Sequence, residues 1–193
     1  EAQRDSQGTT IVMHMKEDAK SYLDYWKVSS IIKKYSDFIE YPVMMKHTVK
    51  KDDKETVEDS TLNSMKAIWL RPESEVTAEE FNSFYTHLSG QVGEPLKRIS
   101  YSAEGTSEFK ALLFLPARAP FDFQFGERRT NGLHLYVRRV FITDNCPGLL
   151  PDYLRFVSGV VDSSDLPLNI SREMLQDNPQ ILRINKALTK RIL

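Results

Sequence analysis

Residues 108–115 read EFKALLFL and residues 133–142 read LHLYVRRVFI, and these two stretches decide the fold. Nearly continuous apolar runs of this length are typical of central strands that are covered on both faces. A neighbouring strand is predicted over 96–102. Because helical patterns flank these strands, the sequence predicts an α/β (α+β) fold in which helices cover a mixed β-sheet.

The chain before these strands contains further expected elements. A β-branched run predicts a strand over 8–15, and apolar residues at helical spacing predict an amphipathic helix over 20–39. The Tyr-Pro pair at 41–42 opens an extended segment, so a strand is expected over 42–49. A polar, solvated hairpin loop over 50–64 and a short strand over 65–70 complete this part.

Helix signals mark the middle and the end of the chain. Thr77 and Glu80 form a capping box, which predicts a helix that ends at Gly90. After Pro147 the pattern becomes helical, with helices expected over 150–157, 171–176 and 180–193. The last of these has no C-terminal stop signal, so the sequence looks cut from a longer protein.

Composition limits the class of protein. Of the 193 residues 40% are hydrophobic, which is enough to bury a core, and no apolar run approaches the ~20 residues of a membrane helix. The formal net charge of -1 gives no global attraction for nucleic acid or anionic lipid. The single cysteine, Cys146, indicates a reducing compartment. We therefore expect a soluble, cytoplasmic protein without membrane or nucleic-acid partners.

Several kinds of chemistry lack a motif in this sequence. The four histidines are too scattered for metal-ligand spacing, so no metal site is predicted; they are His14, His47, His87 and His134. Cys146 has no nearby histidine to activate it and is expected to be an inert surface thiol. Walker A and Rossmann glycine spacings are also absent, so the chain has no motif with which to hold ATP alone.

The most informative candidate is Arg172. Ser171 can cap a short helix, which would place Arg172 at its first position and Gln176 on the same face. A helix N-terminus and a guanidinium that converge on one anion make a good phosphate receptor. The alternative is an ordinary surface arginine that is paired with Glu173 beside it.

Three apolar residues are candidates for contacts with other protein surfaces. Leu166 and Leu168 alternate along an extended loop, so one of them is exposed or both belong to the core. Trp69 lies before a proline turn, where a half-exposed tryptophan would be an anchor for a partner. The competing interpretation is a core tryptophan under the following helix.

The sequence resembles the middle domain of heat-shock protein 90 (Hsp90) chaperones, which are ATP-dependent proteins of the stress response. The resemblance is carried by LYVRRVFITD at 135–144 and by the uninterrupted match over 151–176, and it continues over 35–42, 109–116 and 119–122. It implies the large α/β subdomain of that domain, a fold like ribosomal protein S5 domain 2, over 17–193. Residues 1–16 would then be the last strand of the preceding ATP-binding domain.

The resemblance also implies a catalytic role for one loop. The arginine that matches Arg172 approaches the γ-phosphate of ATP, which is held with Mg²⁺ by the preceding domain, and Asn169 and Gln176 match residues of the same loop. Since that domain lies outside this sequence, the fragment alone is expected to be inactive as an ATPase. An arginine supplied from another domain would couple hydrolysis to domain closure.

Docking and partner roles follow from the same resemblance. The residues that match Leu166 and Leu168 help to dock the catalytic loop, and the tryptophan at Trp69 is implicated in contacts with unfolded or client proteins. The expected partners are clients, the chain's own N-terminal domain and a second copy joined through a C-terminal domain. Departures at 123–126 indicate a bacterial or organellar member.

A DNA-gripping transducer domain of a related ATP-driven clamp is the alternative function. Its basic patch would consist of Arg128, Arg129, Arg138 and Arg139. The net charge of -1 already argues against this alternative.

Overall fold

The computed structural model describes residues 7–51, 54–105, 107–118, 132–146, 148–167, 175 and 178–193. Its main feature is a five-stranded sheet in the order β3-β4-β7-β5-β6. The strands are β3 (Lys97–Ala103), β4 (Phe109–Leu115), β5 (Leu133–Val137), β6 (Val140–Thr143) and β7 (Ser158–Ser163). Only the β5–β7 pair is parallel. The predicted mixed sheet is therefore confirmed.

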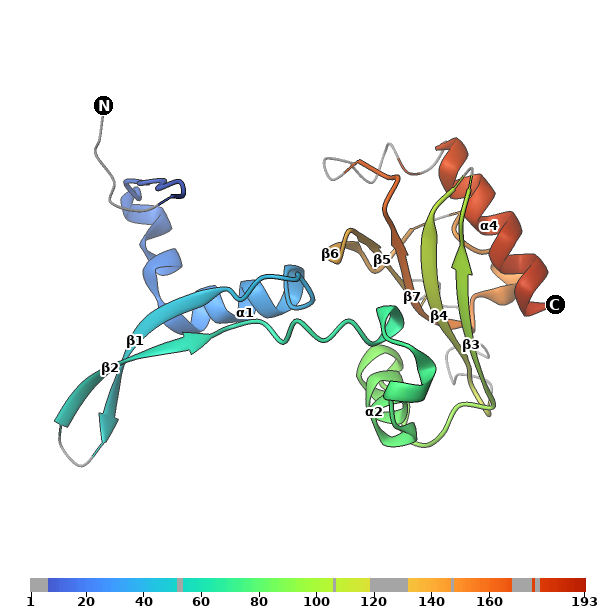
Figure 1. Ribbon diagram of the computed structural model, residues 1–193, viewed down its shortest axis with the longest axis horizontal. Helices are drawn as coiled ribbons and strands as arrows, with labels where there is room; N and C mark the ends of the chain where they lie inside the picture. The colour runs from blue at the N-terminus through green and yellow to red at the C-terminus, as the bar shows by residue number, and fades with distance from the viewer. Residues whose placement is uncertain are drawn as a thin grey trace.

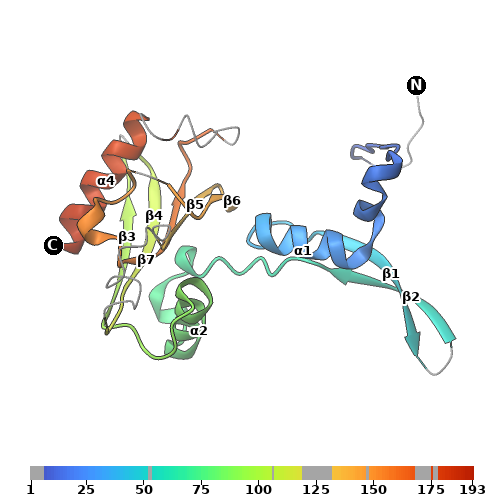
Figure 2. The ribbon, with the colours of Figure 1, turned by 180° about the vertical axis from the view of Figure 1, so that it is seen from behind.

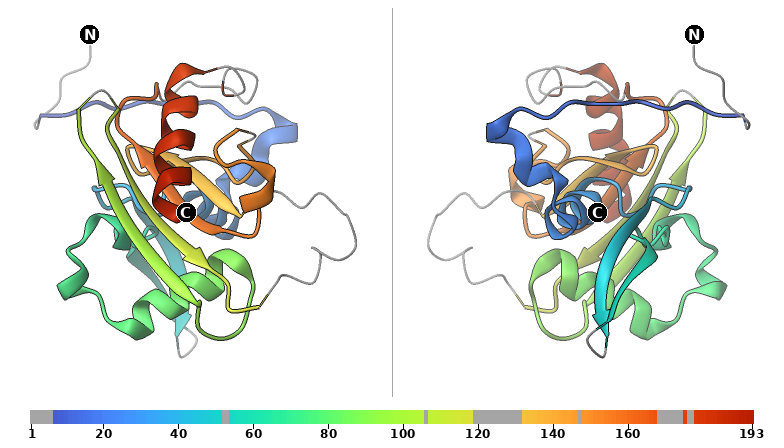
Figure 3. Two further views of the ribbon diagram at one scale, coloured as in Figure 1. Left: turned by 90° about the vertical axis from the view of Figure 1, so that its right-hand side faces the viewer. Right: turned by 90° about the vertical axis from the view of Figure 1, so that its left-hand side faces the viewer.

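Successive side chains along the central strands of this sheet pack in two separate apolar layers, one on each face. Ala111 and Leu113 of β4 pack with α4 (Pro179–Ile192), through its buried residues Ile181, Ile184 and Leu188. Leu112 and Phe114 point to the other face, where they meet α2 (Ala78–Ser89). Figures 1 and 3 show α4 against one face of the sheet and α2 on the opposite side. β4 and β7 are thus covered on both faces, as the sequence predicts for β4.

The N-terminal part forms a separate arm. It contains the turns of η1 (Glu17–Leu23), the helix α1 (Tyr25–Tyr35) and a two-stranded ribbon of β1 (Met44–Lys51) and β2 (Lys54–Thr61). Figures 1 and 2 show the ribbon pointing away from the five-stranded sheet. The arm meets the rest of the molecule through aromatic rings. The ring centres of Tyr35 and Phe141 are 6.0 Å apart, and those of Phe38 and Trp69 are 4.8 Å apart.

Two predictions for this arm are wrong. The expected strand over 8–15 does not form, and Ile11, Val12 and Met13 are more than 70% exposed. A β-branched run needs a neighbouring strand, and no strand in the described part of the chain pairs with it. The predicted helix over 20–39 is shorter, since α1 begins at Tyr25 after Asp24, whose side chain accepts a hydrogen bond from Lys27 N at 2.9 Å.

Residues 54–70 also depart from expectation. The expected loop over 50–64 includes β2, which forms because it pairs along its whole length with β1 rather than because of an apolar pattern. The expected strand over 65–70 is replaced by a left-handed residue, Met65 with φ 59°, and the short 3-10 helix η2 (Ile68–Leu70).

The C-terminal half contains one missed strand and one missed turn. The predicted strand over 133–142 is two strands, β5 and β6, joined by a turn at Arg138 and Arg139. The predicted helix over 150–157 is only η5 (Asp152–Leu154), and β7 follows it. The predicted helix over 171–176 lies outside the described residues, except for Leu175.

The capping box and α4 are confirmed. Thr77 Oγ1 accepts from Glu80 N at 3.2 Å, while Glu80 Oε2 accepts from Thr77 N at 2.9 Å. α2 ends at Gly90, which has a left-handed φ of 66°. Among the residues that the structure describes, no helix is long and apolar enough to cross a membrane.

Candidate functional site

The structure places only two of the six predicted site residues. Arg172, Asn169, Gln176 and Leu168 lie outside the described residues, whereas Leu166 and Trp69 lie within them. The site can therefore be built from its two described flanks and from the strand that leads into it, β7.

Both flanks of this segment are anchored in the core. Leu166 is 1% exposed and Leu175 is fully buried, and both belong to the apolar layer under α4. The core interpretation of Leu166 is confirmed. α4 begins four residues after Leu175, and the side chain of its N-cap residue Asn178 accepts a hydrogen bond from Gln180 N at 2.8 Å. The residues Leu166 and Leu175, on either side of the segment that carries Arg172, are thus buried in the same apolar layer.

A hydrogen-bonded clamp fixes the end of β7. The backbone N–H of Glu108 donates to Asp165 Oδ2 at 2.6 Å, and the Glu108 carbonyl accepts from Ser164 N at 3.2 Å. Ser163 Oγ donates to the same carbonyl at 3.3 Å and accepts from Leu166 N at 3.4 Å. The chain therefore leaves the sheet along a fixed path before the segment with Arg172 begins.

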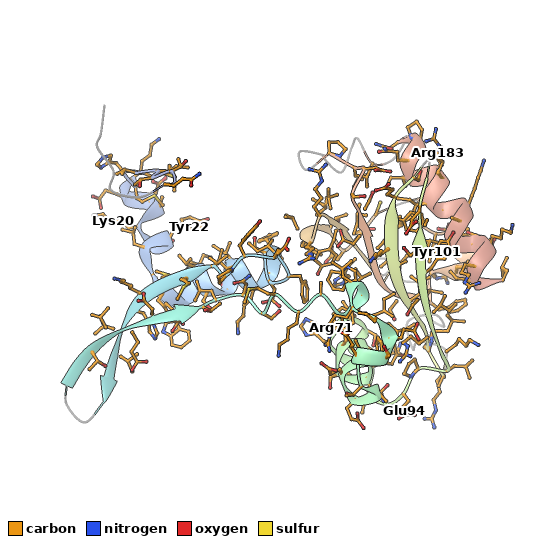
Figure 4. All side chains as sticks on the ribbon, viewed as in Figure 1. Lys20, Tyr22, Arg71, Glu94, Tyr101 and Arg183 are labelled. Carbon is orange, nitrogen blue, oxygen red and sulfur yellow. The ribbon has the colours of Figure 1, made fainter. Side chains whose placement is uncertain are left out.

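Trp69 is a buried residue in an aromatic cluster. It is 7% exposed and its ring lies 4.8 Å from Phe38, 5.1 Å from Tyr136 and 5.8 Å from Phe84. Of the two interpretations, the half-exposed tryptophan is wrong and the core tryptophan under the following helix is confirmed, because η2 turns the side chain inward, between α2 and the sheet. We call Trp69, Phe38, Phe84 and Tyr136 the Trp69 cluster. In Figure 4, Arg71 marks where the chain from β2 reaches this cluster.

A buried carboxylate, Asp162, lies at the inner edge of the Trp69 cluster. Its Oδ2 accepts from Trp69 Nε1 at 2.9 Å and its Oδ1 accepts from Arg139 N at 3.1 Å. Burial raises the pKa of Asp162, while its bonds to Trp69 and Arg139 lower it in part. Nothing in the sequence marks Asp162 except its place, a lone acid after the apolar pair Val160-Val161.

The β5–β6 turn is strained and lies beside Asp162. Arg138 and Arg139 have φ values of 48° and 67°, a conformation that favours glycine or asparagine. The turn is held on β7, because Arg138 N donates to Ser163 O at 3.1 Å and Arg138 Nε donates to Ser164 O at 3.2 Å. Strain of this kind often accompanies function.

An open cavity of about 380 Å³ adjoins this turn, and charged groups of both signs line it. The charged lining residues are Glu104, Glu108, Lys110, Arg138, Arg139 and Asp162. The cavity therefore lies between the clamp on β7 and the Arg138–Arg139 turn. Of the four arginines in the proposed basic patch, Arg128 and Arg129 lie outside the described residues.

Cys146 takes no part in this site. The expectation of a surface thiol is wrong, since Cys146 is fully buried in the layer under α4 and burial raises its pKa to about 11. The described residues contain no group of three or more histidine, cysteine or acidic side chains that could hold a metal.

Comparison with known proteins identifies the family. A family model described as "Hsp90 protein" matches residues 45–193. The chaperone protein HtpG of Geobacter sulfurreducens is 56% identical over 206 aligned residues, which cover 100% of this chain and 32% of the relative. HtpG of Geobacter metallireducens is also 56% identical over 207 residues, with coverage of 100% and 32%. HtpG of Gluconobacter oxydans is 50% identical over 192 residues, with coverage of 100% and 30%.

These relatives are bacterial chaperones by name, and the chain spans about a third of their length. The family match over 45–193 includes the whole five-stranded sheet and the helices that cover it. This chain belongs to the Hsp90 family of molecular chaperones.

Proposed function

We propose that this chain is the middle-domain part of an ATP-dependent bacterial chaperone and supplies Arg172 to the γ-phosphate of ATP. The preceding domain holds the nucleotide and Mg²⁺, and Asn169 and Gln176 assist from the same loop. The observation that best supports this is the double anchoring of the segment at Leu166 and Leu175. Fixed ends reduce the entropy lost when a side chain is delivered to a reacting group.

A chimera tests the role of Arg172. This chain replaces the matched third of HtpG from Geobacter sulfurreducens, and ATP turnover is measured with and without Arg172→Ala. We expect a loss of at least about 100-fold in kcat with nucleotide affinity unchanged, because the arginine acts on the charge of the transition state. Arg183→Ala, on α4 (Figure 4), is the matched control and keeps its turnover. Unchanged turnover in Arg172→Ala would reject the proposal.

The same proposal includes the binding of unfolded client proteins at the Trp69 cluster. Phe38 and Phe84 are only partly buried, so an apolar segment of a client can pack on their rings. Both rings pack against Trp69, so client binding there changes the surroundings of Trp69. Leu168 would act with Leu166 in docking the loop. A second copy, joined through a C-terminal domain, would complete the dimeric chaperone.

Client binding is measured with Trp69 as its own reporter. The chain has two tryptophans, so Trp26→Phe leaves Trp69 as the only one. Addition of a tryptophan-free unfolded protein, reduced and carboxymethylated ribonuclease A, should shift or quench the emission of Trp69 in a saturable way. The folded ribonuclease is the control. No response to the unfolded form would contradict client contact at this cluster.

A further inference from the structure

The cavity of about 380 Å³ beside the β5–β6 turn extends across the end of the five-stranded sheet. Its floor contains Ser102 of β3, Lys110 of β4 and Asp162 of β7, which lie opposite one another in the register of the sheet. Protein cavities of about 300–1,000 Å³ hold small organic ligands. The cavity is therefore large enough for a small molecule.

The two ends of this cavity carry opposite charges. Glu104, after β3, and Glu108, before β4, line one end, and Arg138 and Arg139 in the β5–β6 turn line the other. β7 lies between β4 and β5, so two strand spacings separate β4 from β5, which makes roughly 10 Å. The cavity thus has an acidic end and a basic end.

These charges do not neutralise one another. All the charged lining residues belong to the described part of the chain, and no ion pair joins any of the cations to any of the acids. Asp162 is already compensated within the protein, because it accepts from Trp69 Nε1 and Arg139 N. Arg138 uses its Nε for Ser164 O, and its terminal NH₂ groups have no partner among the described residues. Opposite charges that are held apart complement a ligand that carries both.

The backbone of the basic end indicates that its arginine side chains have a use. Only three non-glycine residues in the described part of the chain have a positive φ, and two of them are Arg138 and Arg139. Asparagine and glycine form such a turn without this strain. Strained backbone clusters at binding sites, where the side chain that it carries is needed.

We propose that this cavity binds a small zwitterion, in which a short chain joins a carboxylate to an ammonium group. The carboxylate accepts hydrogen bonds from the guanidinium of Arg138, and the ammonium group donates to Glu104 and Glu108. Leu70 and Ala103, half-buried in the wall of the cavity, pack against the connecting chain. The site uses neither ATP nor a client, so it goes beyond the proposed function.

A titration of the ¹⁵N-labelled chain tests this site with ε-aminocaproate, whose alkyl chain joins the two charged groups. The reporters are two backbone N–H groups, that of Glu108 at the acidic end and that of Arg139 at the basic end. We expect both resonances to shift in a saturable way. Caproate and hexylamine each carry one of the two charges and should bind at least about 10-fold more weakly, because simultaneous engagement of both ends strengthens binding.

A second zwitterion distinguishes two sources of this chemistry. Triglycine carries the same two charges on a peptide backbone, whose carbonyl groups can accept hydrogen bonds from Lys110 and Ser102. Tighter binding of triglycine would identify the ligand as a short peptide, and tighter binding of ε-aminocaproate would identify it as a simple amino acid. Either result supports a zwitterion site.

Two variants locate the ends of the ligand. Arg138→Asn removes the guanidinium and introduces a residue that the left-handed turn favours, so the fold is kept. Glu104→Gln removes an acid at the other end. Each variant should weaken the binding of ε-aminocaproate at least about 10-fold. The matched controls Arg183→Asn and Glu79→Gln, at exposed positions outside the cavity, should keep the affinity.

Three results would overturn the proposal. The first is equal affinity for ε-aminocaproate and caproate, which would show that only the carboxylate is recognised. The second is unchanged affinity in both Arg138→Asn and Glu104→Gln, which would place the binding elsewhere. The third is the absence of saturable shifts with either zwitterion. None of these measurements uses ATP turnover, so the role of Arg172 can fail without affecting them.

Discussion

Single residues in β7 determine how closely the sheet can pack. Gly159 has a φ of +152°, and a Cβ at this position would lie 2.2 Å from the carbonyl oxygen of Leu112 and 2.9 Å from Leu113 Cα. Because both contacts are with backbone atoms of β4, the neighbouring strand would have to move. A glycine is required here for close approach of two central strands.

Gly159→Ala is therefore expected to lower the free energy of unfolding by about 3 kcal/mol. The free energy of unfolding is measured by urea denaturation of the wild type and of the Gly159→Ala variant. Gly93→Ala is the matched control: its φ is +112°, but nothing lies within 4 Å of the new Cβ, so we expect a loss of only about 1 kcal/mol from the backbone. Equal losses at both positions would show that packing against β4 is not the cause.

The buried thiol of Cys146 predicts a pH dependence. Burial raises its pKa from 9.0 to about 11, so in the unfolded chain the thiol ionises first. Stability should be unaffected below pH 9 and should fall by about 3 kcal/mol between pH 9 and 11. Other groups titrate there too, so the quantity to compare is the difference in stability between wild type and Cys146→Ala. That difference should shrink as pH rises, and a constant difference would contradict the assignment.

Single elements depend on local signals to different degrees. α2 is specified by its own sequence, because its capping box and its C-terminal glycine act within the helix. η2 and β7 are specified by their neighbours: Trp69 turns inward onto α2, and β7 is placed by pairing with β4 and β5. The elements with local signals are the ones that the sequence predicts correctly.

Removal of the cap on α2 tests this view. Thr77→Ala deletes the acceptor for Glu80 N, and we expect a loss of about 1 kcal/mol in the free energy of unfolding. Thr86→Ala, at an exposed position of the same helix, should change stability by less than about 0.5 kcal/mol. Urea denaturation of both variants measures the difference, and a cap effect no larger than that of Thr86 would count against the capping box.

The whole molecule is uneven in its packing. β4 and β7 lie inside the sheet and between two apolar layers, whereas η1 and α1 contain no buried residue. The arm contacts the rest of the molecule through two aromatic side chains: Tyr35 faces Phe141 of β6, and Phe38 packs on Trp69. Stability should therefore be concentrated in the sheet.

Hydrogen exchange followed by mass spectrometry gives the test at this scale. We expect the slowest amides in β4 and β7, and exchange in α1 faster by at least about 100-fold, because opening the arm exposes little apolar surface. Exchange of α1 at the rate of β4 would show that the arm and the sheet unfold together.

Patterns in the sequence were enough to predict the apolar strand β4, the capped helix α2, the amphipathic helix α4 and, through the resemblance, the family. Each depends on a pattern that lies within a few residues. Only the folded structure shows that residues 8–15 form no strand, that β7 is central despite Gly159 and its polar residues, and that Trp69 is buried. The same holds for the two hydrogen bonds of Asp162, because Trp69, Arg139 and Asp162 lie on three elements distant in sequence and only packing brings them together.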